Sequence, residues 1–129
     1  MTLSMKSNLI ELPTSDWTVG GHLLHFQSCK ICSHVWYFHR SFCPNCGDTS
    51  PLTTPTNGRG VIFTQTLVYR APDAKFKELA PYNIVLVDLE EGFRVMAHGD
   101  KNLSIGDSVL LSFITHAEQQ IPYFKKYEI

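Results

Sequence analysis

The segment CKICSHVWYFHRSFCPNCG, residues 29–47, contains all four cysteines of this 129-residue chain. They form two Cys-x-x-Cys pairs, Cys29 with Cys32 and Cys43 with Cys46, and ten residues separate the pairs. Each pair can turn two thiolates toward one point, and a hairpin between the pairs would bring all four sulfur atoms together. Zn²⁺ prefers such a tetrahedral set of soft ligands. The pattern therefore predicts one zinc site within a small ribbon.

Two other interpretations would account for four cysteines. They could pair into two disulfides, or they could remain free thiols in a core. Pro44 fixes one φ angle inside the second pair, and Gly47 directly after it can take the positive φ that a tight metal-binding turn often needs. No other feature of the sequence indicates an oxidising compartment. The sequence thus favours a metal, with zinc as the first choice and iron in a rubredoxin-like site as the second.

The composition is that of a folded protein without a strong charge. Hydrophobic residues make up 43% of the chain, charged residues make up 18%, and the formal net charge is −1. Such a charge gives no general attraction to nucleic acid or to an anionic membrane surface. No apolar run has the length of a signal h-region or of a membrane span. We therefore expect a cytoplasmic protein whose partners are proteins or small molecules.

The part before residue 51 divides into an arm and a ribbon. Residues 1–21 are predicted to form an N-terminal arm, and residues 22–50 to form the zinc ribbon. The first ribbon strand leads directly into Cys29. We expect Leu23, Leu24 and Phe26 on this strand to cover the metal site.

The second part of the chain, residues 58–129, is predicted to be a barrel. Residues 48–60 are rich in Ser, Thr, Pro and Gly and are interpreted as a linker. Beyond them, five strand-like runs occur at residues 61–70, 83–89, 93–98, 109–114 and 121–127. Five strands separated by turns predict a small closed or partly open barrel, and the fold class is therefore mainly β.

Large aromatic residues are concentrated between the two cysteine pairs. Trp36, Tyr37 and Phe38 stand close to Arg40, and a ribbon of this size has almost no interior. The rings must therefore either pack on the barrel or form a binding surface. Aromatic residues beside an arginine have the composition of interface anchors, so we predict that these four residues contact a partner.

A fifth predicted partner contact is Phe76. It lies in the long segment 71–82 between two predicted barrel strands, and lysines flank it at positions 75 and 77. This segment either contacts a partner or an anionic ligand with an apolar portion, or it is a solvated loop with one anchoring aromatic ring.

The order of these motifs resembles the acyl-CoA-associated OB-fold proteins that carry an N-terminal rubredoxin-like zinc ribbon. The resemblance covers about residues 22–126. It rests on CKIC (29–32), CPNCG (43–47), NGRGVIFTQTLVY (57–69), PYNIVLVDLEEGFRVMAHG (81–99), LSIGDSVLLSF (103–113) and IPYFKK (121–126). It implies a zinc ribbon followed by a five-stranded OB-fold barrel.

The resemblance also implies a function. Proteins of this family are accessory subunits that bridge thiolase-like, ketosynthase-like or hydratase-like enzymes and help to shape the passage for CoA or the acyl group. The chain has WYFHR at residues 36–40, where a proline-rich stretch before arginine is usual in the family. This difference brings it closer to the small subunits of multicomponent acyltransferases that act on acylphloroglucinol-type products of secondary metabolism.

The residues themselves predict no catalytic site. The cysteines are assigned to the metal, no Gly-x-Ser-x-Gly nucleophile motif occurs, and a zinc bound by four cysteines has no open position for water. A stand-alone CoA-binding enzyme is therefore disfavoured. The alternative class is a module that binds single-stranded nucleic acid, because ribbons and OB folds both occur in that role. The acids Asp88, Glu90 and Glu91 and the negative net charge argue against it.

Overall fold

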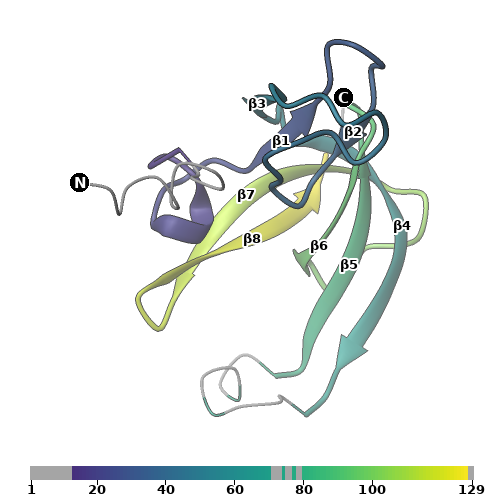
Figure 1. Ribbon diagram of the computed structural model, residues 1–129. Helices are drawn as coiled ribbons and strands as arrows, with labels where there is room; N and C mark the ends of the chain where they lie inside the picture. Colours follow the sequence, from purple (N-terminus) through teal and green to yellow (C-terminus); the bar gives the residue numbers. More distant parts are fainter. Residues whose placement is uncertain (1–12, 71–73, 75–76, 78–79, 128–129) are drawn as a thin grey trace.

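The computed structural model of the chain describes residues 13–70, 74, 77 and 80–127. This part is almost entirely β, with a small three-stranded sheet beside a closed barrel (Figure 1). Before the small sheet, the arm makes a single 3-10 turn, η1 (Trp17–Val19). Among the residues described, none of the helical segments is long and apolar enough to cross a membrane.

The small sheet contains the strands that carry the cysteine turns. It is formed by β1 (His25–Ser28), β2 (Val35–Trp36) and β3 (Leu52–Pro55), in the order β2-β1-β3, and β1 is antiparallel to both neighbours. Residues 52–55 fall in the predicted linker, so that prediction is wrong for them. The sequence LTTP has no buried residue and ends in proline. It forms a strand because its backbone pairs with β1, which an apolar pattern could not reveal.

The barrel has five strands in the order β4-β5-β6-β8-β7, and β7 pairs with β4 to close it. All neighbours are antiparallel except β6 and β8, which are parallel. The strands are β4 (Arg59–Val68), β5 (Tyr82–Leu89), β6 (Arg94–Gly99), β7 (Ser108–His116) and β8 (Gln119–Lys126). The predicted mainly β fold with a five-stranded barrel is confirmed.

Strand β5 shows how the sequence alternates between the inside and the outside of the barrel. Val85 and Val87 are completely buried, whereas Leu86 between them is half-buried and Asp88 is exposed. Such alternation follows from the two-residue period of a strand. Leu86 therefore belongs to the outer face of the barrel.

The turn into β6 ends at Gly92, whose φ of 105° is rarely adopted by residues with a side chain.

The ribbon is joined to the barrel through aromatic rings. Phe26 on β1 stacks on Phe93 of the barrel with 4.8 Å between ring centroids, and Tyr37 stacks on the same ring at 5.9 Å. Leu24 and Phe26 are buried in the core that contains the barrel residues, while Leu23 is 42% exposed. The expectation that these three residues cover the metal site is therefore wrong. The strand faces the barrel because the barrel offers more apolar surface than four cysteines do.

Candidate metal centre

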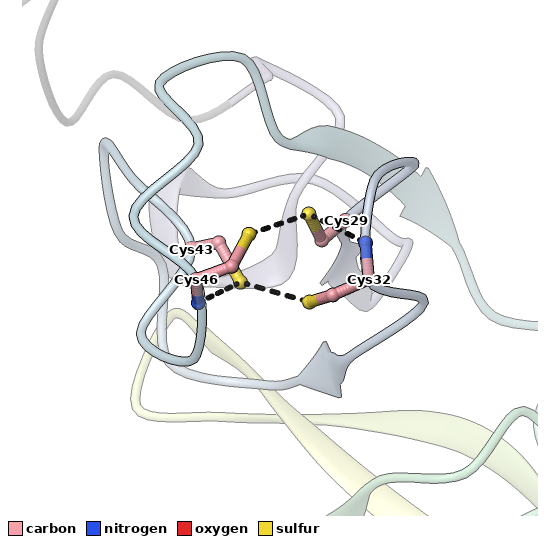
Figure 2. A group of neighbouring side chains, drawn as sticks. All are labelled: Cys29, Cys32, Cys43 and Cys46. Atoms are coloured by element: carbon pink, nitrogen blue, oxygen red, sulfur yellow. Dashed lines mark hydrogen bonds between the residues drawn. The ribbon is translucent and has the colours of Figure 1, made fainter.

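The four cysteine sulfur atoms all lie within 4.8 Å of one another (Figure 2). The distance between the Sγ atoms is 3.5 Å for Cys29 and Cys46 and 3.6 Å for Cys32 and Cys43, so neither pair is a disulfide. A tetrahedral zinc with Zn–S bonds of about 2.3 Å would place its sulfur atoms about 3.8 Å apart. The cluster therefore has the size of a tetrahedral site for one metal ion.

Each cysteine pair is shaped by the same backbone turn. The N–H groups of Ile31 and Cys32 donate to the sulfur of Cys29 at 3.4 and 3.5 Å. In the second turn, the N–H groups of Asn45 and Cys46 donate to the sulfur of Cys43 at 3.3 and 3.5 Å. Backbone donors of this kind offset the negative charge of metal-bound thiolates. The two halves of the cluster are thus equivalent in their local geometry.

Both turns end on a residue with positive φ. Gly47 has a φ of 85°, and Ser33, at the equivalent place in the first turn, has a φ of 66°. Glycine adopts this conformation at no steric cost, but serine does not. The first turn is therefore held in a less favourable conformation, which the N–H of Ser33 supports by donating to the carbonyl oxygen of Cys29 at 2.9 Å.

The cluster does not favour four thiolates by itself. The side-chain hydrogen bond from Asn45 and a backbone hydrogen bond at His34 lower the pKa of Cys32 to about 6. The pKa of Cys46 is instead raised to about 12: the backbone hydrogen bond at Asp48 lowers it, but the neighbouring Cys29 sulfur and burial raise it more. Four negative charges in this space would need a bound cation. These donors fit zinc, which would supply that cation and act structurally.

A buried glutamine, which the sequence interpretation missed, holds the segment between the cysteine pairs. Gln27 on β1 is 2% exposed, and its Oε1 accepts hydrogen bonds from the indole Nε1 of Trp36 at 2.7 Å and from the N–H of Arg40 at 2.6 Å. Its Nε2 donates to the carbonyl oxygen of Arg40 at 2.9 Å and lies 3.4 Å from Oγ1 of Thr53. The available signal was a glutamine within the strand that leads directly into Cys29.

The five predicted partner contacts differ in how far the structure exposes them. Trp36 is only 8% exposed and packs against the cysteines, so the premise that its surface is free is wrong. Tyr37 is half-buried on Phe93, whereas Phe38 is 79% exposed and Arg40 is also exposed. Phe76 lies outside the residues that the structure describes. Trp36 is buried against the cysteines rather than against the barrel, and Gln27 accepts its indole N–H.

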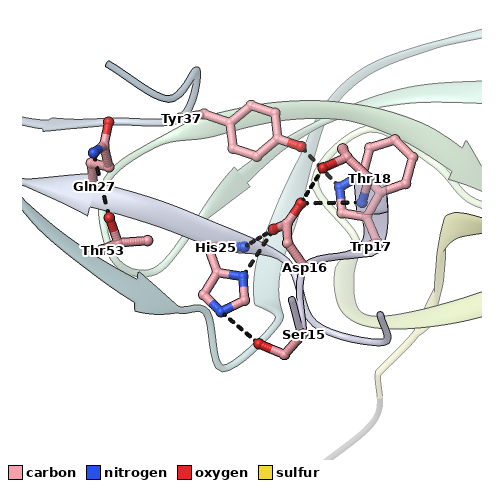
Figure 3. A network of polar contacts seen from close by, with 8 residues as sticks. All are labelled: Ser15, Asp16, Trp17, Thr18, His25, Gln27, Tyr37 and Thr53. Atoms are coloured by element: carbon pink, nitrogen blue, oxygen red, sulfur yellow. Dashed lines mark hydrogen bonds and ion pairs between the residues drawn. The ribbon is translucent and has the colours of Figure 1, made fainter. Parts of the chain in front are cut away.

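A polar network joins the arm to β1: Ser15 and Asp16 of the arm both contact the imidazole ring of His25 on β1 (Figure 3). Nε2 of His25 lies 3.4 Å from Oγ of Ser15, and Nδ1 of His25 lies 2.8 Å from Oδ1 of Asp16. This is the atom order of a nucleophile, a base and an orienting acid. The sequence analysis did not expect such an arrangement.

The carboxylate of Asp16 has a structural task in this network. Its Oδ2 accepts hydrogen bonds from the N–H and the hydroxyl of Thr18 at 3.1 and 2.5 Å, as expected of the cap of η1. Burial alone raises the pKa of Asp16, but the hydrogen bonds from Thr18 and His25 lower it below its ordinary value. Because Oδ2 caps η1 and Oδ1 fastens the arm to β1 through His25, the network is explained without a catalytic role.

Comparison with known proteins identifies the family. Residues 53–114 match the family model of the C-terminal OB-fold domain of ChsH2. A DUF35 domain-containing scaffold protein of Methanothermobacter thermautotrophicus is 32% identical over 92 residues, and the match covers 67% of this chain and 68% of that protein. The chain belongs to the DUF35 family. A DUF35 domain-containing scaffold protein of Methanocaldococcus jannaschii is 35% identical over 68 residues, which is 52% of this chain and about half, 48%, of that protein.

Solved structures agree with this family assignment. The chain of a structure described as "Ltp2-ChsH2(DUF35) aldolase" has 26% sequence identity to this DUF35 chain and a TM-score of 0.69, with 81% of this chain and 84% of that chain covered. A DUF35 protein of unknown function from Sulfolobus solfataricus has a TM-score of 0.55 at 12% identity, covering 81% and 76% of the two chains. The second match shows the shared fold alone. The predicted resemblance to OB-fold proteins of this family is confirmed.

Proposed function

We propose that this DUF35 chain is a non-catalytic accessory subunit that organises a thiolase-like multicomponent acyltransferase. The observation that carries the proposal is its similarity to one DUF35 scaffold protein over two thirds of both chains. The structure described as an Ltp2-ChsH2(DUF35) aldolase supports it, because there a chain of similar fold is named together with a second component. The chemistry is proposed to be acyl transfer from acyl-CoA or a polyketide-type donor, with acylphloroglucinol-type products as the specific case.

In this proposal, the metal centre acts as a rigid support. Cys29, Cys32, Cys43 and Cys46 would hold one Zn²⁺, which fixes both turns at the ends of the segment that carries Phe38. The Zn²⁺ would supply structural cross-linking only, since four cysteine ligands leave no position for water. Cysteines that form no disulfide fit a reducing compartment, so we propose that the protein is cytoplasmic.

The exposed residues of the ribbon are the proposed contact with the partner enzyme. Phe38 presents most of its ring to solvent, and the backbone two residues later is held by Gln27. An aromatic ring on a preorganised segment loses little conformational freedom when a partner covers it, which favours binding. Arg40 beside it is exposed and completes this contact.

Reconstitution tests the proposal. The untagged chain is co-expressed with candidate thiolase-like subunits, and complex formation is followed by size-exclusion chromatography with mass spectrometry. We expect a stable complex and acyl transfer that is lost when this chain is omitted. Acyl transfer or thioester hydrolysis by the purified single chain, abolished in Ser15→Ala, would instead show that the serine network is an active site.

A direct probe strengthens this test. A fluorophosphonate reacts covalently with activated serines, and we expect it to leave the native chain unlabelled because Asp16 is engaged by Thr18. Labelling that disappears in Ser15→Ala would contradict the non-catalytic part of the proposal, even if the complex forms.

A further inference from the structure

A cavity of about 610 Å³ lies where the arm, the ribbon and the outer face of the barrel meet. This volume is within the range of pockets that hold small molecules, about 300–1,000 Å³. The apolar residues of its walls are Trp17 of η1, Tyr37 and Phe38 after β2, Leu86 of β5, and Val95 and Met96 of β6. Because three separate parts of the fold supply these walls, the cavity depends on the tertiary structure rather than on one strand.

The charged groups of the cavity are already paired. Asp16 is engaged by His25 and Thr18, as described above. Nε of Arg94 lies 2.5 Å from Oδ1 of Asp88, and its guanidinium group also stands 3.5 Å above the ring of Phe63. A charged ligand would have to compete with these internal partners. The lining therefore favours a neutral molecule.

One polar group of the lining has unused hydrogen-bonding capacity. The hydroxyl of Tyr37 accepts a hydrogen bond from Nε1 of Trp17 at 3.1 Å (Figure 3). Its own hydrogen has no acceptor among the residues that the structure describes. Burial raises the pKa of Tyr37, so the hydroxyl stays protonated over the physiological range. A ligand oxygen that only accepts, such as a carbonyl, would satisfy it.

We propose that this cavity binds a neutral, mainly apolar carbonyl compound, such as an aryl ketone. The ring of the ligand packs between Trp17 and the outer-face residues Leu86 and Met96, and its carbonyl oxygen accepts the Tyr37 hydroxyl. The inference does not depend on the accessory role, because the isolated chain contains every group that it uses.

The test uses prodan, a neutral naphthyl ketone whose emission moves to shorter wavelength in apolar surroundings. We expect saturable binding to the purified, metal-containing chain, and displacement by acetylnaphthalene. Ethylnaphthalene lacks the carbonyl and should bind about two- to tenfold more weakly than acetylnaphthalene, the usual net effect of one hydrogen bond. Naphthoate, an anion of the same shape, should compete more weakly than the ketone.

Variants locate the site. Leu86→Trp should fill the cavity and abolish prodan binding, whereas Ile105→Ala, at a comparably apolar and 66% exposed position outside the lining, should leave it unchanged. In Tyr37→Phe, the preference for acetylnaphthalene over ethylnaphthalene should vanish. This second variant decides the matter even if Leu86→Trp does not fold.

Three results would overturn the inference: prodan emission that never saturates, equal binding by wild type and folded Leu86→Trp, or an unchanged ketone preference in Tyr37→Phe. If the cavity is instead a docking site for a partner protein, we expect the first result, prodan emission that never saturates. Since the accessory role is tested by complex formation and this inference by ligand binding to the single chain, the two can fail separately.

Discussion

The amide of Gln27 satisfies several buried polar groups at once. Its oxygen accepts from Trp36 and Arg40, and its nitrogen donates back to the carbonyl of Arg40. No hydrocarbon side chain can replace these bonds, so a substitution would leave donors and an acceptor without partners in the interior. Buried groups of this kind are costly when unpaired, about 1–3 kcal/mol each.

We therefore predict that Gln27→Met, which keeps the length of the side chain, lowers the free energy of unfolding by at least about 2 kcal/mol. Urea unfolding of the metal-containing protein measures this loss of stability. The matched control is Gln119→Met at an exposed position of β8, which should change stability by less than about 0.5 kcal/mol. Equal stability of the two variants would show that the amide does not organise the ribbon.

Asp16 leads to a prediction about acid stability. Hydrogen bonds lower its pKa in the folded state below the ordinary value of 3.8, so folding favours the carboxylate. Its contribution to stability is complete above the unfolded pKa and is lost as the pH falls through the folded pKa. The stability difference between wild type and Asp16→Asn should therefore be largest above about pH 5 and shrink below about pH 4.

Comparing the two proteins removes the effect of acid on the cysteine cluster, which both share. Unfolding is measured by urea at each pH. A stability difference that stays constant down to the lowest pH at which both proteins fold would contradict the assignment of Asp16 as an ionised cap.

At the scale of elements, the sequence was sufficient where apolar runs are bounded by turn residues. The strands of the barrel were predicted close to their observed positions, because runs such as residues 84–87 of β5 are apolar and rich in β-forming residues. Strand β3 was missed since its residues are held by backbone pairing and carry no burial signal. The cavity could not be predicted either, because arm, ribbon and barrel residues meet there only after folding.

The candidate metal centre also has a part that the sequence predicts and a part that it does not. The spacing of the cysteines was sufficient to predict that their sulfur atoms converge, and the structure brings them together. The role of Gln27 and the burial of Trp36 depend on side chains from two strands, and nothing local to either residue indicates the other. The Ser-His-Asp network was missed for the same reason, since Ser15 and His25 meet only through the return of the chain into β1.

The ribbon also yields a prediction about the metal. We expect one equivalent per chain after purification without chelator, and Cys43→Ser should bind less than this and loosen the ribbon, because zinc binding and folding of such ribbons are coupled. Metal analysis and hydrogen exchange measure the two effects, with the strongest loss of protection in β1 and β2. Exchange in β5 should change little, as its neighbours are the barrel strands β4 and β6. Full native protection of the ribbon in metal-free protein would contradict this prediction.

At the scale of the whole molecule, the ribbon and the barrel act as one body because Phe26 and Tyr37 both stack on Phe93. Phe38, next to Tyr37, is then the ring left exposed on a fixed support. It contacts the ring of Tyr37 with 5.4 Å between centroids, but 79% of its surface stays exposed. The three neighbouring aromatic residues thus divide between the metal centre, the barrel and the proposed partner.

This division predicts opposite outcomes for two neighbouring substitutions. Phe38→Ala should weaken binding to the proposed thiolase-like partner by about 2 kcal/mol or more, roughly thirtyfold, if the ring is the interface anchor that we propose. It should leave the metal content and melting temperature unchanged, since the ring is 79% exposed.

Trp36→Ala should instead lower the free energy of unfolding by about 3–5 kcal/mol, as expected for a buried aromatic ring. Titration calorimetry and thermal unfolding of both variants measure these effects, and Ile105→Ala serves as the exposed control. If Phe38→Ala binds the partner as tightly as the wild type does, the contact lies elsewhere on the chain, and the ribbon serves only the stability of the fold.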